Sequence, residues 1–140
     1  MHDFSLRRYM TASPHTIDAS ATYAEAGRRM HEHHIRHLPV MAGEELLSVV
    51  TDEHVAFIAA LKGSFPDSVR LDEVSGPRPY IVTPDSDLQQ VARELIENKQ
   101  SAAVVLDKGR VVGVFTLIDA LRALIDLSAE ARRIPVAHPT

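Results

Sequence analysis

A hydrophobic pattern occurs twice along this chain, displaced by 65 residues without a gap, and this repeat limits the possible fold more than any other feature. Few residues are identical between the two copies, but Pro14 and Thr51 fall on Pro79 and Thr116. Two segments with one pattern predict two copies of one fold unit. The coinciding apolar pairs are Tyr23 with Leu88, Ala26 with Val91, Met30 with Leu95, Val40 with Val105 and Val49 with Val114.

The second copy predicts the element order strand, helix, strand, strand, helix. A short apolar run ends at Thr83-Pro84, and Asp85 or Ser86 is expected to cap the following helix. That helix has apolar residues at the spacing of one buried stripe. Two later apolar runs flank a turn that contains Gly109, which predicts a strand pair. The expected elements are a strand at 80–82, a helix at 88–96, strands at 102–106 and 111–115, and a helix at 119–127.

The first copy, residues 8–62, predicts the same plan. A connector at 63–70 has a turn-forming composition, and the second copy spans residues 71–127. The tail at 128–140 contains two prolines and little periodicity, so we expect it to be loosely ordered. After a first strand near residues 16–18, the elements expected in the first copy are a helix at 23–33, strands at 38–41 and 46–50, and a helix at 53–61.

This order predicts a mixed α+β fold of two β-α-β-β-α repeats. A single unit of this size is too small to bury its own sheet well. We therefore expect the two repeats to pack sheet to sheet with pseudo-two-fold symmetry around one shared core. Clefts are then expected where the two copies meet.

The composition excludes several classes of function. A formal net charge of −4 argues against non-specific binding to a nucleic acid backbone. The chain has no cysteine, which excludes disulfides and thiolate metal sites. No segment approaches the ~20 apolar residues of a membrane span, so we expect a cytoplasmic protein. Nucleophile-elbow, Walker and zinc-protease motifs are absent, and we expect no enzyme activity and no required cofactor.

Three short motifs occur in a fixed order: at the start of the first copy, at its second strand, and at the last strand–helix junction. Together with the duplication, they resemble the tandem cystathionine-β-synthase (CBS) domain pair, or Bateman module, over nearly the whole chain. The resemblance implies a regulatory module that binds an adenine nucleotide or a related adenosyl ligand between its copies and acts on a partner protein. The motifs are Tyr9-Met10-Thr11, His34-Ile35-Arg36-His37-Leu38-Pro39-Val40 and Gly113-Val114-Phe115-Thr116-Leu117-Ile118-Asp119.

The chemistry of the last motif can be argued from its residues. Gly113 lets a ligand or a facing strand approach the backbone closely. Thr116 lies where a strand becomes a helix, so its hydroxyl can face an anion at the helix N-terminus. The Asp119 carboxylate can accept the hydrogen bonds of a ribose diol. Alternatively, Thr116 and Asp119 form only a capping box.

The resemblance implies two clefts, each built from both copies, and neither has a complete set of residues here. We favour the cleft in which Thr116 and Asp119 hold the ribose. Ser101 and Ala102 replace a basic pair in this copy. The facing copy supplies base contacts near Thr16, Ile17 and Ile35.

The other cleft keeps the basic pair Arg36 and His37 for a phosphate, together with Thr51. It holds the base near Thr83 and Gln100, but it lacks the diol carboxylate because His54 stands in that position. A module in which neither cleft binds a ligand, a ligand-free scaffold or dimerisation module, is the alternative function.

Four of the eight histidines lie close together in the sequence. His33 and His37 have the i, i+4 spacing that can hold a metal on a helix, but no carboxylate or cysteine completes a set. We therefore expect a solvated last helical turn and no metal site.

A homodimer is expected through the exposed faces of the second helix of each copy. The residues expected to form it are Val55, Phe57 and Ile58 in the first copy and Leu121 and Leu124 in the second.

Overall fold

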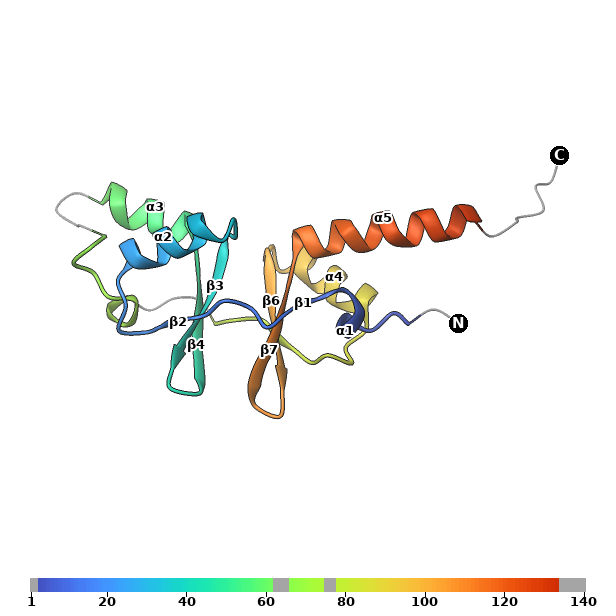
Figure 1. Ribbon diagram of the computed structural model, residues 1–140, viewed down its shortest axis with the longest axis horizontal. Helices are drawn as coiled ribbons and strands as arrows, with labels where there is room; N and C mark the ends of the chain where they lie inside the picture. The colour runs from blue at the N-terminus through green and yellow to red at the C-terminus, as the bar shows by residue number, and fades with distance from the viewer. Residues whose placement is uncertain (1–2, 62–65, 75–77, 134–140) are drawn as a thin grey trace.

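Two small sheets lie side by side, and each is flanked by two helices from its own part of the sequence (Figure 1). The structure is a computed structural model that describes residues 3–61, 66–74 and 78–133. The sheets have the strand orders β2-β3-β4 and β1-β7-β6-β5. The predicted α+β fold of two similar halves is confirmed. The strands are β1 (Thr11–Ala12), β2 (Ile17–Asp18), β3 (His37–Ala42), β4 (Glu45–Thr51), β5 (Ile81–Val82), β6 (Ala102–Asp107) and β7 (Arg110–Thr116).

The helices follow the same two-copy plan. All elements predicted between residues 23 and 61 and between 80 and 116 are present, with ends that differ by one residue. Apolar residues at helical spacing explain α2 and α4, which each bury one stripe against their sheet. The helices are α1 (Leu6–Tyr9), α2 (Tyr23–Glu32), α3 (Asp52–Ala60), α4 (Leu88–Glu97) and α5 (Leu117–Arg133), with a 3-10 turn, η1 (Leu71–Glu73).

The two sheets have the same pattern of strand pairing, including one irregularity at equivalent positions. In each, the first strand is parallel to the second, and the second pairs antiparallel with the third. The register of the antiparallel pair shifts between Val40 and Met41 in one sheet and between Val105 and Leu106 in the other. These positions are related by the displacement of 65 residues, so the sequence repeat is also a structural repeat.

The segment that opens each repeat crosses to the other repeat. Leu6 is fully buried in the core of the second repeat, and its N–H donates to the carbonyl of Ser86 at 3.0 Å. Leu71 is buried in the core of the first repeat, and its N–H donates to the carbonyl of Ala21 at 2.9 Å. The two contacts are equivalent under the 65-residue displacement. The repeats are therefore interlocked rather than arranged as two consecutive blocks.

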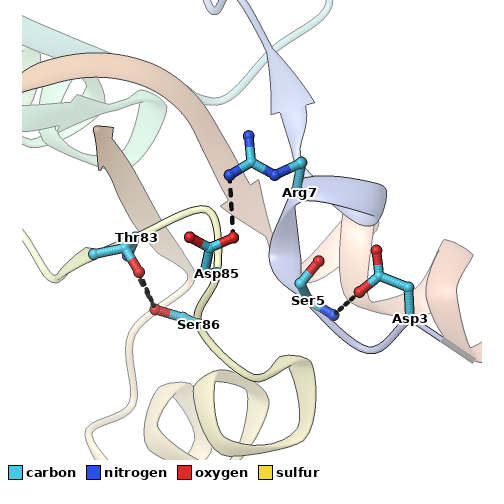
Figure 2. Close-up of polar contacts among 6 residues, drawn as sticks. All are labelled: Asp3, Ser5, Arg7, Thr83, Asp85 and Ser86. Carbon is cyan, nitrogen blue, oxygen red and sulfur yellow. Dashed lines mark hydrogen bonds and ion pairs between the residues drawn. The ribbon is translucent and has the colours of Figure 1, made fainter. Parts of the chain in front are cut away.

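Side chains in the loop before α4 hold the crossing N-terminal segment. Figure 2 shows Arg7 directed at Asp85, at 3.1 Å, and Thr83 beside Ser86. The predicted cap at Asp85 or Ser86 is wrong, because α4 begins at Leu88 and the capping position is the residue directly before it. Asp87 is the cap, and its carboxylate accepts from an N–H of the first turn of α4 at 3.0 Å.

The last helix, α5, continues to Arg133, so the predicted loosely ordered tail is wrong for residues 128–133. The physical reason is that Ser128–Arg133 contains good helix formers and no glycine or proline. Arg132 and Arg133 also lie at the end of the helix, where positive charge is favourable. Residues 134–140 of the predicted tail and residues 63–65 of the predicted connector lie outside the described residues.

Buried apolar residues form two clusters, one in each repeat, and the predicted single shared core is wrong. Two helices per repeat already cover one face of each sheet, so each repeat buries its own apolar row. Pro39 and Val104 are fully buried but belong to neither cluster. Because strand side chains alternate in direction, we place these two equivalent residues on the sheet faces turned toward each other.

Candidate functional site

A pocket of about 490 Å³ is lined by both repeats, beside the turns of the β3–β4 and β6–β7 hairpins. We call it the inter-repeat pocket. In the first repeat β2, α2 and the β3–β4 hairpin line it, and in the second repeat the start of β7 does. Two of the predicted base contacts are therefore in a pocket that both copies share. The lining residues are Thr16, Ile17, Asp18, Arg29, Met41, Gly43, Glu44, Arg110 and Val111.

Charged side chains of both signs line the inter-repeat pocket. Arg29 is held in place because its guanidinium donates to the carbonyl oxygen of Thr16 at 2.8 Å. Asp18 accepts from the hydroxyl and the N–H of Ser20, and these bonds lower the pKa of its carboxyl. The main chain of Arg110 pairs with Asp107 in the hairpin, whereas its guanidinium has no hydrogen bond or ion pair with any of the described residues. The pocket thus has one fixed arginine and one free arginine, from different repeats.

The carboxylate of Asp119 is buried and its oxygens are occupied. One oxygen accepts from the Thr11 hydroxyl at 2.9 Å, and the other accepts from the N–H and hydroxyl of Thr116 at 2.9 and 3.2 Å. Arg122 lies 3.8 Å from the first oxygen. Asp119 is 3 % exposed and does not line the inter-repeat pocket. The structure has the capping-box arrangement, and the ribose contact remains a prediction that requires displacement of a threonine hydroxyl.

Gly113 is the point where the N-terminal strand approaches the backbone of β7. A Cβ atom there would lie 2.7 Å from Met10 Sδ and 3.0 Å from the Thr11 carbonyl oxygen. β1 pairs with β7 through Ala12 opposite Gly113. The sequence predicted that Gly113 makes room for a ligand or for a facing strand, and in the structure the neighbour is the facing strand β1.

The first repeat has an equivalent cap at α3. The Thr51 hydroxyl accepts from the N–H of His54 at 3.2 Å, and the Thr51 N–H donates to His54 Nδ1 at 3.1 Å. His54 therefore completes the capping box at the start of α3, as Asp119 does at the start of α5. This equivalence indicates that the Thr-x-x-Asp/His pattern begins a helix in both copies.

Ile35 was predicted to contact the base together with Thr16 and Ile17, but it lines a different groove, of about 510 Å³ between α2 and α3. The basic pair predicted for the second cleft is divided between two places. Arg36 lines the same groove as Ile35 and lies 3.9 Å from Asp52. His37 instead points across the contact between repeats, with Nε2 at 2.8 Å from the Ser101 hydroxyl. Burial lowers the pKa of His37, which favours the neutral ring in this contact.

The predicted base contacts of the second cleft do not line either of these places. The N–H of Thr83 donates to the Ser86 hydroxyl at 3.0 Å. Gln100 has a buried side-chain oxygen that accepts no hydrogen bond from the residues that the structure describes. Neither residue lines the groove that contains Ile35 and Arg36.

Sequence reasoning missed most residues of the inter-repeat pocket, above all Arg29, Met41, Arg110 and Val111. Arg29 lies on the exposed face of a predicted helix, and Arg110 is the last residue of a predicted turn, so each has an ordinary surface explanation. One sequence signal could have drawn attention to Arg29. When the two copies are aligned with a displacement of 65 residues, Arg29 corresponds to Glu94, so the copies differ in charge at this position.

The histidines do not converge. His33 stacks on His15 with ring centroids 3.7 Å apart, whereas His37 contacts Ser101. Within residues 3–61, 66–74 and 78–133, no group of three or more His, Cys, Asp or Glu side chains is placed to hold a metal ion.

The CBS domain family model matches residues 6–60 and again residues 71–126, which together make up most of the chain. The chain belongs to the CBS domain family. A homoserine O-acetyltransferase from Methanohalobium evestigatum is 31% identical over 111 residues, which are 78% of this chain but 22% of that enzyme. This chain thus spans about a fifth of the length of that relative.

Solved structures share the fold over nearly all of this chain. A candidate acetoin utilization protein from Vibrio cholerae has a TM-score of 0.82 at 25% identity, with 94% of this chain and 98% of that chain covered. The CBS domain pair of protein MJ0100, in complex with 5′-methylthioadenosine and S-adenosyl-L-methionine, has a TM-score of 0.79 at 22% identity, with 88% and 97% covered. CBSX2 in complex with AMP has a TM-score of 0.74 at 22% identity, with 89% and 98% covered.

None of the helices in the described part of this CBS chain is both long enough and apolar enough to cross a bilayer.

Proposed function

We propose that this CBS domain pair is a regulatory module that binds an adenosine-containing ligand in the inter-repeat pocket and acts on a partner protein. The observation that carries this proposal is the pocket of about 490 Å³ lined by both repeats. Pockets of 300–1,000 Å³ are typical of small-molecule sites. Proteins of the same fold bind 5′-methylthioadenosine, S-adenosyl-L-methionine or AMP, which supports an adenosine ligand here.

The lining of the pocket suits a purine with a polar substituent. Met41 and Val111 are half-buried and come from different repeats, so they offer apolar surface to a flat base. Ile17 is buried in the first core, and its main chain pairs with Val40 of β3 at the edge of the pocket. Thr16 has a half-buried side chain, and its carbonyl already accepts from Arg29. The predicted base contacts Thr16 and Ile17 are therefore retained in the proposal.

A ligand in this pocket would act as a regulator because it touches both repeats. Such a ligand binds best to conformations in which the two hairpins are close enough for it to contact both. Binding therefore increases the fraction of molecules in those conformations. A partner that recognises the outer helix faces would respond to that shift. The proposal assigns no catalytic step to this chain.

The first experiment titrates the chain with adenosine, 5′-methylthioadenosine, AMP and S-adenosyl-L-methionine by calorimetry. We expect binding of at least one of them to the natural chain and loss of that binding in Val111→Glu, which places a charge on the apolar wall of the pocket. Leu47→Glu is the matched control, because Leu47 is a β4 residue that is 42 % exposed and outside the pocket lining. The proposal is wrong if none of the four binds, or if Val111→Glu and Leu47→Glu bind equally well.

The second candidate function is a ligand-free scaffold or dimerisation module. Exposed apolar side chains on α5 favour it, since a row of such residues marks an interaction surface. A groove of about 410 Å³ between α4 and α5 lies beside them. The exposed apolar residues of α5 are Leu117, Ile118, Leu121, Leu124 and Ile125.

The structure changes the predicted dimer contacts in the first repeat. Ile58 is 6 % exposed and belongs to the core, so it is unavailable to a partner. Val55 is half-buried and packs against the same core. Phe57 is 64 % exposed and remains a candidate contact.

A further inference from the structure

We propose that the groove between α2 and α3 is the docking surface for α5 of a second copy of this chain, so that two copies pair head to tail. In this dimer the second repeat of each copy lies on the first repeat of the other. The dimer requires no bound nucleotide and therefore goes beyond the proposed function. We call the groove the α2–α3 groove and the exposed apolar face of α5 the α5 ridge, which consists of Leu117, Ile118, Leu121, Leu124 and Ile125.

Packing within its own repeat does not explain the α5 ridge. The five ridge residues have the spacing i, i+1, i+4, i+7 and i+8, which places them on one face of the helix. Each of them is between 49 % and 69 % exposed. The residues of α5 that pack in the second core, such as Ala120 and Ala123, lie on the other face. Five large apolar side chains on one exposed face mark an interaction surface.

The equivalent helix of the first repeat, α3, has the reverse distribution of side-chain size. Under the 65-residue displacement, α3 has alanine where α5 has three of its ridge residues, and these alanines are exposed. The larger apolar residues Val55 and Ile58 of α3 pack in the first core instead. The outer face of α3 is therefore low where that of α5 is high. The equivalent pairs are Ala56 with Leu121, Ala59 with Leu124 and Ala60 with Ile125.

The α2–α3 groove has the size and the lining to receive such a ridge. Its volume is about 510 Å³, and small residues such as Gly27 and Ala59 line it. Gly27 allows the two helices to approach closely, because a Cβ atom there would lie 3.2 Å from Val55 Cγ1. The exposed Arg36 and Asp52 in the lining lie 3.9 Å apart, so docking would leave neither charge without a partner. Small apolar residues beside a polar rim are typical of a protein interface.

Head-to-tail pairing uses both surfaces of each copy. Because the ridge and the groove belong to different repeats of one chain, a two-fold axis brings each ridge to the groove of the other copy and closes the assembly at two copies. The contact then occurs twice, so each needs to bury only about half of the ~1,600 Å² of a standard protein interface. Head-to-head pairing would instead place alanines against alanines and leucines against leucines, and both α2–α3 grooves would stay unfilled. The size complementarity therefore favours head-to-tail pairing.

Cross-linking tests the orientation directly, because the chain has no cysteine and introduced thiols have no competitors. Ala59→Cys and Leu124→Cys are treated with a short bis-maleimide, each alone and after co-expression of the two. We expect cross-linked dimers from the co-expressed pair and few from either variant alone. Leu47→Cys co-expressed with Leu124→Cys is the matched control and should not cross-link, because Leu47 is exposed on β4 rather than on a helix. Self-cross-linking of Leu124→Cys to the extent of the pair, or no cross-linking in any sample, would overturn the proposal.

Filling the α2–α3 groove is the second test. Ala59→Leu puts a larger side chain where the ridge docks, and analytical ultracentrifugation should show the Kd of the dimer raised about tenfold or more. Ala42→Leu is the matched control, since Ala42 is the exposed last residue of β3, and it should leave the Kd unchanged. Both alanines are exposed, so both variants should melt like the natural chain.

The two tests separate this dimer from the proposed function, because neither contains a nucleotide. A monomeric natural chain, or equal dimerisation of Ala59→Leu and Ala42→Leu, overturns the head-to-tail dimer and leaves nucleotide binding untouched. A chain that passes both tests but binds none of the adenosine ligands keeps the dimer and loses the proposed function.

Discussion

At the scale of single residues, Thr116 and Asp119 could either cap a helix or bind a ribose, and the structure shows the helix cap. Asp119 lies three residues after Thr116, which suits both a capping box and a ribose contact. In the structure the capping partners and the Thr11 hydroxyl occupy the carboxylate. Residue spacing alone could not distinguish these roles, because Thr11 comes from a segment more than a hundred residues away in the chain.

Replacing Asp119 with alanine should therefore reduce stability. The substitution removes the buried acceptor of the half-buried Thr116 N–H and of the exposed Thr11 hydroxyl, and we expect a loss of about 1–3 kcal/mol in the free energy of unfolding. Urea denaturation measures this loss. Asp126→Ala is the control, since Asp126 is exposed and lies 3.6 Å from Arg8, and it should cost less than about 1 kcal/mol. Equal stability of the natural chain and Asp119→Ala, together with lost nucleotide binding, would instead favour the ribose role.

His37 predicts a pH dependence of stability. Burial lowers the pKa of His37 in the folded chain, although nearby Asp52 opposes this effect and Arg36 adds to it. The unfolded chain then takes up a proton first as the pH falls below the ordinary value near 6.5, so stability is lost in that direction. Urea denaturation at pH 7.5 and 5.5 should show a larger loss for the natural chain than for His37→Gln. An identical loss in both proteins would contradict the account.

At the scale of helices and strands, local patterns predicted most of the fold, and contacts between distant segments account for what they missed. The apolar stripes of α2 and α4 and the paired strands of each hairpin were predictable because their signals lie within a few turns of the chain. β1 is two residues long and pairs with β7, so it has no periodicity to detect. The crossing of Leu6 and Leu71 into opposite repeats likewise depends on partners far away in sequence.

This crossing predicts that a substitution loosens the opposite repeat. Leu71 belongs to the core of the first repeat, and Leu71→Ala should cost about 2–4 kcal/mol. Hydrogen exchange should then show faster exchange in α2 and β3 than in α4 and β6. Leu6→Ala is the matched variant and should produce the reverse pattern, because Leu6 lies in the second core. If Leu71→Ala instead speeds exchange mainly in α4 and β6, the interlocked arrangement is wrong.

At the scale of the whole molecule, the duplication predicted two similar halves, and the differences between them identify the candidate site. Sequence comparison of the copies showed a divided set of ligand residues. It could not show that Thr16 and Ile17 share a pocket with Arg110 and Val111, because that depends on how the two hairpins face each other. The reversed charges at the equivalent position, Glu94 in place of Arg29, follow from the same duplication.

The exposed apolar face of α5 predicts a homodimer. Leu121 and Leu124 are 55 % and 60 % exposed, which is unusual for two leucines on one helix of a monomer. Analytical ultracentrifugation should find a dimer for the natural chain and a monomer for the double variant Leu121→Glu, Leu124→Glu. Leu47→Glu, on the edge of the other repeat, should remain dimeric. A monomeric natural chain at micromolar concentration would contradict this prediction.

The most direct test is the crystal structure of this chain grown with AMP. The account predicts AMP in the inter-repeat pocket, with its base between Met41 and Val111. Density for AMP at Asp119 with the Thr11 hydroxyl displaced, or an AMP-saturated chain whose inter-repeat pocket is empty, would contradict it.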